Sequence, residues 1–173
     1  KLTAFTGNTG IGKSSILKLI PRLYDATVGH VYVDDMNVKQ YKLNELRDLI
    51  GYIPQKNVLF SGDVASNLRF GDQDSSEEQW RQAAYMACAD EFIEQKPDGY
   101  HAEIAQGGTN LSGGQRQRMA IARAVVKKPE IYLFDDSFSA LDVKTDKTLR
   151  MRLRESMGDS TMLIVAQRVG SIL

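Results

Sequence analysis

The sequence has a single cysteine, Cys88, and no excess of either charge. One cysteine excludes an internal disulfide and is typical of a reducing compartment, with the thiol expected to act as a small buried apolar side chain. The 22 basic and 22 acidic residues cancel, so nucleic acid is not an expected partner. No apolar run approaches the roughly 20 residues of a membrane-spanning helix, and no secretory signal is visible.

What is present is an ordinary globular composition. Of the 173 residues, 42% are hydrophobic and 25% are charged, which suits one domain with a sizeable core and a small inserted subdomain. The chain begins inside a predicted strand, six residues before its first motif. We therefore expect it to be part of a longer polypeptide.

That first motif is a glycine-rich loop between a predicted strand and a predicted helix. Residues 7–14 fit G-x-x-x-x-G-K-[ST], the phosphate-binding loop. The apolar run Leu2 to Phe5 predicts a strand before it, and apolar residues at helical spacing from Ile16 to Tyr24 predict a helix after it. Pro21 is expected to mark a kink or an end of this helix. The expected phosphate-binding residues are Gly7, Asn8, Thr9, Gly10, Ile11, Gly12, Lys13, Ser14 and Ser15.

The residue types of the loop explain its chemistry. Glycines let the backbone curl so that successive N–H groups face one anion, and the helix that follows adds the positive end of its dipole. Lys13 is expected to reach the β- and γ-phosphates of a nucleotide, and the Ser14 hydroxyl is expected to hold Mg²⁺. The alternative, a glycine-rich turn that happens to precede a helix, is disfavoured by the surrounding pattern.

Strands and helices alternate along the rest of the chain. Strands are predicted at 30–33, 52–54, 131–134 and 161–165, and a turn at 34–37. Helices are predicted at 43–50, 112–126 and 142–157. The uninterrupted apolar run at 131–134 is typical of a central parallel strand. The sequence therefore predicts an α/β fold with a mostly parallel sheet.

Residues 58–110 look different, because they show helical patterns and no buried-strand pattern. Ser76 is expected to open a helix that carries Trp80 and Tyr85, and both aromatic side chains are expected to pack in a core. We predict a helical subdomain at 58–110, inserted into a core formed by residues 1–57 and 111–173.

Polar side chains follow three of the predicted strands. In parallel sheets, ligands bind at the carboxyl ends of strands, where Gln55, Asp135, Asp136 and Gln167 are expected. A carboxylate there, beside a phosphate loop, is placed to hold Mg²⁺. Gln55 fits a plain loop residue equally well, and either aspartate alone fits a helix cap.

A second glycine motif, Leu111-Ser112-Gly113-Gly114-Gln115, lies at the start of a predicted helix. Ser112 is a suitable N-cap. The two glycines weaken the first turn but expose N–H groups at the positive end of the helix, which makes a second potential phosphate site. Asp142, which ends the run Ser139-Ala140-Leu141-Asp142, is expected to cap the following helix.

Five elements follow one another along the chain: the phosphate loop, Gln55, the LSGGQ motif, the strand ending in two aspartates, and the SALD run. In this order and spacing they resemble the nucleotide-binding domain of ATP-binding-cassette (ABC) transporters. The resemblance runs nearly end to end, and residues 58–68 are similar to the exporter branch of that family. It implies a P-loop NTPase (RecA-like) fold, ATP and Mg²⁺ as ligands, and a signature loop (LSGGQ) at the end of the helical subdomain.

The resemblance also implies roles for single residues. Asp135 would hold Mg²⁺ through water, and Gln55 would sense the metal and couple to a membrane subunit. Ser112, Gly113, Gly114 and Gln115 would close on ATP held by a partner domain, and Asp142 would lie in a loop crossing the dimer interface. Two such domains would sandwich two ATP molecules head to tail at the cytoplasmic face of a membrane, attached to a transmembrane domain.

Two residues depart from the pattern of family members that hydrolyse ATP well. Asp136 stands where those members have glutamate, and its shorter side chain draws the carboxylate back by roughly 1.5 Å. A general base needs a distance of about 2.6–3.2 Å to its proton donor, and the retreat increases that distance. Gln167 stands where histidine is usual, and its amide carries no proton-linked charge. The expected catalytic residues are thus Asp136, Gln167 and Gln55. ATP hydrolysis at this site is expected to be attenuated.

Both departures fall in the site built on this chain's own phosphate loop, whereas the signature that serves the opposite site is intact. One hypothesis is therefore that this chain is one half of a heterodimeric exporter. An alternative is a nucleotide-gated clamp that binds ATP and barely hydrolyses it. A soluble cassette ATPase acting on DNA or ribosomes is a third reading, disfavoured by the neutral charge and the exporter-like segment.

Overall fold

The computed structural model describes residues 1–166, and the chain divides into two compact units. The first unit contains Lys1–Pro54, Pro129–Ser137 and the described residues from Asp159 onward. The second contains Gln55–Lys128 and Phe138–Gly158. The predicted division into a core of residues 1–57 and 111–173 and a subdomain of residues 58–110 stays a prediction.

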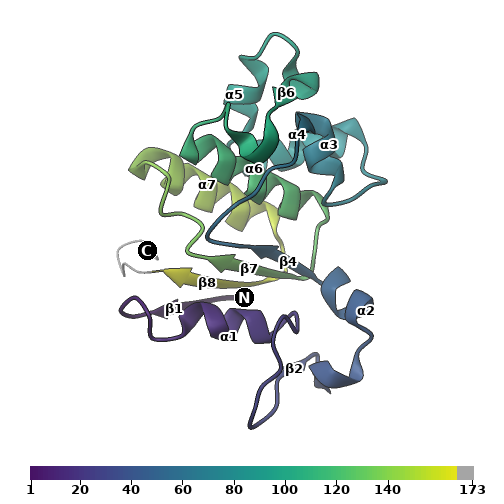
Figure 1. Ribbon diagram of the computed structural model, residues 1–173, viewed down its shortest axis with the longest axis vertical. Coiled ribbons are helices and arrows are strands. Elements are labelled where there is room, and N and C mark those ends of the chain that lie inside the picture. Colours follow the sequence, from purple (N-terminus) through teal and green to yellow (C-terminus); the bar gives the residue numbers. More distant parts are fainter. Residues whose placement is uncertain (167–173) are drawn as a thin grey trace. The chain divides into compact units, whose positions relative to one another are not determined.

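A parallel four-stranded sheet forms the centre of the first unit, with the strand order β1-β8-β7-β4 (Figure 1). Strand β7 lies between its neighbours with Asp135 opposite Val165 and Phe134 opposite Ile53. Four of the five residues of β7 are buried, as a central parallel strand requires. The predicted α/β fold with a parallel sheet is therefore confirmed. The strands are β1 (Leu2–Thr6), β4 (Ile50–Ile53), β7 (Ile131–Asp135) and β8 (Thr161–Ala166).

Helix α1 (Lys13–Leu19) packs on this sheet through contacts with β7 and β8. Leu17 of α1 is fully buried in an apolar cluster with Leu133 of β7, Val165 of β8 and Leu46 of α2 (Leu43–Asp48). Lys13 and Ser14 occupy the first turn of the same helix, one turn before Leu17. Burial of the apolar face of α1 therefore holds the end of the glycine-rich loop against the sheet.

Helix α1 is shorter than its apolar pattern predicts. It ends at Leu19, with Pro21 just beyond it. The side chains of Leu23 and Tyr24 are 46% and 62% exposed. Pro21 was predicted to mark a kink or an end of this helix, and the helix does end before it, because proline cannot extend the hydrogen-bond ladder.

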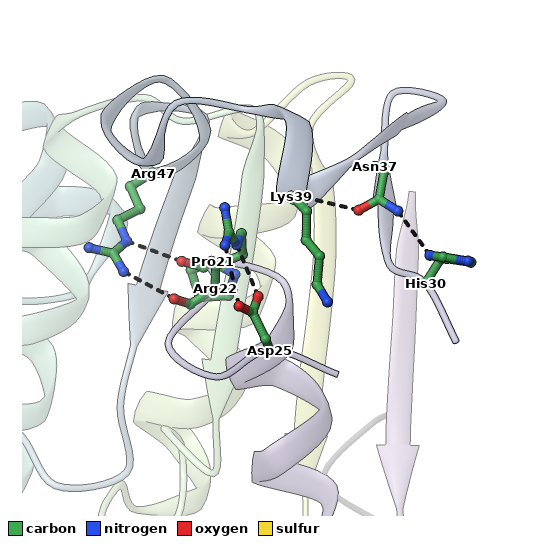
Figure 2. Close-up of polar contacts among 7 residues, drawn as sticks. All are labelled: Pro21, Arg22, Asp25, His30, Asn37, Lys39 and Arg47. Carbon is green, nitrogen blue, oxygen red and sulfur yellow. Dashed lines mark hydrogen bonds and ion pairs between the residues drawn. The ribbon is translucent and has the colours of Figure 1, made fainter. Parts of the chain in front are cut away.

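A short hairpin follows, formed by β2 (Tyr32–Val33) and β3 (Met36–Asn37). The turn was predicted over residues 34–37, but it occupies only Asp34 and Asp35, whose φ angles are 47° and 61°. Aspartate tolerates this left-handed backbone, which two-residue hairpin turns require. Asn37 then caps a 3₁₀ turn, η1 (Val38–Gln40), by accepting from the backbone N–H of Lys39 (Figure 2).

Arg47 of α2 binds the end of the segment that follows α1 (Figure 2). Its Nε donates to the carbonyl oxygen of Pro21 and its Nη2 to that of Arg22, both at 3.1 Å. Carbonyls at the end of a helical segment have no partner within the helix, and one planar guanidinium satisfies two of them. The Arg22 side chain instead pairs with Asp25 at the surface, and its hydrogen bonds lower the pKa of that carboxyl.

We expect Arg47→Ala to lower the free energy of unfolding by about 2 kcal/mol, because two carbonyls lose charged donors. Urea denaturation measures the change. Asp25→Asn is the control, because it breaks only the exposed pair with Arg22 and should leave the unfolding midpoint unchanged. Equal midpoints for Arg47→Ala and the unmodified protein would contradict the expectation.

Helices form most of the second unit (Figure 1). Helix α6 packs against α3 and α4, and α4 also contacts α7. Side chains cap four of these helices, with Asp63, Ser76, Ser112 and Asp142 at the N-caps. None of the helices within residues 1–166 combines the length and apolar composition needed to cross a membrane. The helices are α3 (Val64–Arg69), α4 (Glu77–Met86), α5 (Asp90–Glu94), α6 (Gly113–Val126) and α7 (Val143–Ser156), with 3₁₀ turns η2 (Gly99–His101) and η3 (Gln106–Gly108).

This unit also contains two strands that the sequence pattern missed. Strands β5 (Gly62–Asp63) and β6 (Glu103–Ile104) pair antiparallel, with Gly62 opposite Ile104. Ile104 is fully buried. Strands of two residues are too short for any periodicity to reveal them.

Two aromatic side chains of this unit were predicted to be buried in a core, and one of them is. Trp80 is buried and its Nε1 donates to Ser75 Oγ at 2.8 Å, as a core aromatic should. Cys88 is also buried, as expected. Tyr85 was predicted to be a core residue but is 50% exposed. Its ring is covered instead by the Arg152 guanidinium, 3.9 Å from the ring centroid.

Candidate functional site

The glycine-rich loop adopts the backbone that its sequence predicts. Gly7, Gly10 and Gly12 have φ angles of 147°, 87° and 94°. L-residues with a side chain rarely adopt these values, and glycine adopts them without strain. Gly12 is also the N-cap of α1, so the curled loop leads directly into the positive end of a helix, an arrangement suited to anions.

Lys13 lies against the loop that precedes it. Its Nζ donates to the carbonyl oxygens of Gly7 at 2.6 Å and Asn8 at 2.7 Å. These bonds hold a positive charge at the mouth of the loop. Within the same stretch, Asn8, Thr9, Gly10, Ile11 and Ser15 are exposed, so the loop surface is open to a ligand.

A carboxylate at the end of β7 meets two hydroxyl groups. Ser14 Oγ donates to Asp135 Oδ1 at 2.6 Å, and the Tyr52 hydroxyl donates to Asp135 Oδ2 at 3.0 Å. Asp135 is only 3% exposed. Burial raises the pKa of Tyr52, and the neighbouring Asp135 carboxylate raises it further, so the hydroxyl remains a donor at neutral pH.

The Ser14 and Asp135 oxygens fit Mg²⁺, which prefers hard oxygen ligands. Within the described part of the chain, no group of three or more His, Cys, Asp or Glu side chains could hold a metal. A hydroxyl and one carboxylate do not complete the six-fold shell of Mg²⁺. This site therefore suits a metal that arrives with phosphate oxygens and water.

Asp136 directly follows this carboxylate and has a φ of 50°. Its backbone N–H donates to the Val165 carbonyl oxygen at 3.0 Å, continuing the pairing of β7 with β8 by one residue. Ser137, fully buried, donates its hydroxyl to the Ile53 carbonyl oxygen at 2.8 Å and so joins the end of β7 to β4. Gln167, the third expected catalytic residue, lies outside the described residues.

Sequence reasoning missed Tyr52 and Ser137. Both lie at the same edge of the sheet as Asp135, one in the strand before Gln55 and one in the segment after the two aspartates. The sequence did offer one signal for both residues, a polar group in or beside an otherwise apolar strand. Their partners could not be read from the sequence, because strand order and register decide them.

The remaining expected residues belong to the second unit. Gln55 is exposed and follows the last residue of the first unit. In the signature, Ser112 Oγ accepts from the Gln115 backbone N–H at 3.2 Å, while Gln115 Oε1 accepts from the Ser112 N–H at 2.9 Å. This reciprocal capping box fixes the start of α6.

The two signature glycines lie in the first turn of α6, and one is closely packed. A Cβ atom on Gly114 would lie 3.3 Å from the Ala140 carbonyl oxygen, tighter than ordinary contact. Arg116 Nη1 donates to the carbonyl oxygen of Leu111, the first residue of the motif, at 2.6 Å. Both contacts restrict the backbone of the signature.

Asp142 caps α7, as predicted. Its Oδ1 accepts from the Thr145 backbone N–H at 3.0 Å and its Oδ2 from the Thr145 hydroxyl at 2.6 Å. These hydrogen bonds lower the pKa of Asp142. A position in a loop that crosses a dimer interface stays a prediction for this residue.

Comparison with known proteins agrees with this arrangement. Residues 1–139 match the ABC transporter family. The chain is 50% identical over 172 residues to an ABC transporter ATP-binding protein of Mycobacterium tuberculosis, covering 98% of this chain and 29% of the relative. An ATP-dependent lipid A-core flippase of Coxiella burnetii is 39% identical over 173 residues, with 99% of this chain and 29% of the flippase covered.

A solved structure of a bacterial Atm1-family ABC exporter with ATP bound has a similar fold. Its TM-score is 0.95 at 36% sequence identity, over 99% of this chain and 30% of that chain. The chain thus spans about three-tenths of the length of these proteins. The fold is the P-loop ATPase fold that the resemblance implies, and the chain belongs to the ABC transporter family.

Proposed function

We propose that this chain is the ATP-binding and ATP-hydrolysing domain of a membrane exporter. The observation that carries the proposal is the hydrogen bond between Ser14 Oγ and Asp135 Oδ1, beside a loop on which Lys13 already rests. A cation, a hydroxyl and a carboxylate thus meet at the mouth of a glycine loop. This combination suits a nucleoside triphosphate with its metal.

The chain's own groups have distinct roles in this proposal. The Lys13 ammonium exchanges the carbonyl oxygens of Gly7 and Asn8 for β- and γ-phosphate oxygens. Ser14 and Asp135 would present oxygens to Mg²⁺, the latter through water. When bound, Mg²⁺ would neutralise the charge that develops on the phosphates. Gln55 senses the occupied site and couples it to the membrane subunit.

In the proposal, transport requires a second nucleotide-binding domain of the same fold. Two domains dimerise head to tail around ATP, and Ser112, Gly113, Gly114 and Gln115 of each close on the nucleotide of the other, with Asp142 in the loop between them. A transmembrane domain carries the pair at the cytoplasmic face of the membrane. The exporter and the flippase among the proteins compared support this role, and nucleic acid is not an expected partner.

Hydrolysis at this chain's own site is attenuated in the proposal. Asp136 is one methylene shorter than glutamate, and Gln167 lacks the titratable ring of histidine. The intact signature serves a different chain, which supplies glutamate and histidine at the matching positions. This chain is then one half of a heterodimeric exporter with one slow and one fast site.

The test compares ATPase activity of this protein alone and mixed with its candidate partner. We expect slow turnover alone and an increase of at least about tenfold in the mixture, because a positioned general base contributes about 10²–10⁴-fold. Fast hydrolysis by the protein alone, equal to that of the mixture, would overturn the heterodimer.

A nucleotide-gated clamp is the second candidate, favoured by the same Asp136. In that case ATP closes the dimer and hydrolysis is incidental. Single-turnover hydrolysis and nucleotide-dependent dimerisation separate the two. A clamp dimerises with ATP long before it cleaves any, whereas a motor cleaves ATP and dissociates on the same timescale.

A further inference from the structure

Both oxygens of the Asp135 carboxylate are already engaged by hydroxyl donors from different elements. Ser14, in the first turn of α1, donates to Oδ1, and Tyr52, in β4, donates to Oδ2. In the proposed function Ser14 and Asp135 hold the metal and Gln55 senses it. The Tyr52 bond has no role there, although it is made to the same buried carboxylate.

Strand register explains how Tyr52 reaches this carboxylate. In β4, Tyr52 is paired with Leu133 of β7. Paired residues point to the same face of a sheet, as do residues two apart in one strand, so Tyr52, Leu133 and Asp135 share a face. Two residues span about 6.6 Å of strand, a distance that the long tyrosine side chain covers and a shorter side chain would not.

The two hydroxyl groups differ in whether they would also reach the metal. Ser14 Oγ has lone pairs that would face the metal while its proton stays on Oδ1, whereas Tyr52 acts only through the carboxylate, at Oδ2. Each carboxylate oxygen accepts one of these bonds and keeps a second lone pair for a ligand. Partners of this kind orient metal ligands and affect metal affinity without touching the metal.

We propose that Tyr52 is a positioning residue that orients the Asp135 carboxylate toward the metal carried by the nucleotide. The inference rests on the proposed function, because it assigns Tyr52 to the same site. It goes further by naming a residue from outside the expected ligand set. The hydroxyl acts through Asp135 and does not contact phosphate.

The experiment replaces Tyr52 with phenylalanine and measures ATP affinity twice, once with Mn²⁺ and once with EDTA. We expect the gain in affinity that Mn²⁺ provides to fall by about 10–100-fold, with ATP affinity in EDTA unchanged. Electron paramagnetic resonance of Mn²⁺ at a fixed ATP concentration counts the bound metal directly. The ratio of the two affinities cancels any loss of folded protein.

Tyr41→Phe is the matched control. Its hydroxyl also makes a 3.0 Å hydrogen bond in the first unit, to the Val33 carbonyl oxygen, but not to Asp135. The control should retain the full effect of Mn²⁺. An equal loss in Tyr41→Phe, or an equal fall of the Tyr52→Phe affinity in Mn²⁺ and in EDTA, would overturn the inference.

The design separates this inference from the proposed function. If the unmodified protein gains no ATP affinity from Mn²⁺, the proposed function fails. If it gains affinity and Tyr52→Phe gains as much, only the role of Tyr52 fails.

Discussion

Replacing Lys13 with alanine is expected to lower the affinity for ATP by at least about 100-fold, because charge-assisted hydrogen bonds contribute about 1.5–3 kcal/mol each and two are lost. The ammonium lies 2.6 and 2.7 Å from two carbonyl oxygens of the loop, so it needs little rearrangement to reach phosphate. Isothermal titration with ATP and Mg²⁺ measures the loss.

Lys18→Ala is the control for this experiment, since Lys18 lies in the last turn of the same short helix. It removes an equal charge away from the loop and should change the affinity little. The thermal unfolding midpoint of Lys13→Ala shows whether the loop still folds without the ammonium. Undiminished, Mg²⁺-dependent binding by Lys13→Ala would contradict both the expectation and the proposed function.

Replacing Asp136 with glutamate is expected to raise ATP turnover by at least about tenfold, because a general base within hydrogen-bond reach of its proton contributes about 10²–10⁴-fold. The added methylene restores the reach that aspartate lacks. Steady-state phosphate release by this protein alone gives the change, because the fast site of a partner chain would mask it.

The same substitution should also reduce stability. Asp136 has a φ of 50°, and a left-handed backbone is tolerated better by aspartate and asparagine than by longer side chains, for which it costs roughly 1 kcal/mol. We therefore expect faster turnover together with a lower unfolding midpoint. Asp136→Asn tolerates the backbone but cannot act as a base, so its turnover should not rise. Unchanged turnover in Asp136→Glu would mean that position 136 does not limit hydrolysis.

Predictions from the sequence succeeded where the pattern was local. The glycine loop was expected to curl, and Gly7, Gly10 and Gly12 have positive φ. Ser76 and Ser112 were expected to open helices, and both cap them. Turn and cap chemistry acts over three or four residues, so the sequence shows it directly.

Predictions failed where burial or pairing depended on distant segments. Tyr85 has the residue type and spacing of a core aromatic, yet Arg152 covers it at the surface. Strands β5 and β6 pair across about forty residues of sequence. Such outcomes depend on which element packs against which, and no short window of sequence contains that information.

The sequence by itself determined that a glycine loop is followed by Lys13 and Ser14, and that an apolar strand ends in Asp135 and Asp136. Only the tertiary structure decided that Ser14 and Asp135, separated by 121 residues, share a hydrogen bond, and that Tyr52 holds the other oxygen of the same carboxylate. The physical reason is that the order and register of parallel strands are set by packing of the whole sheet.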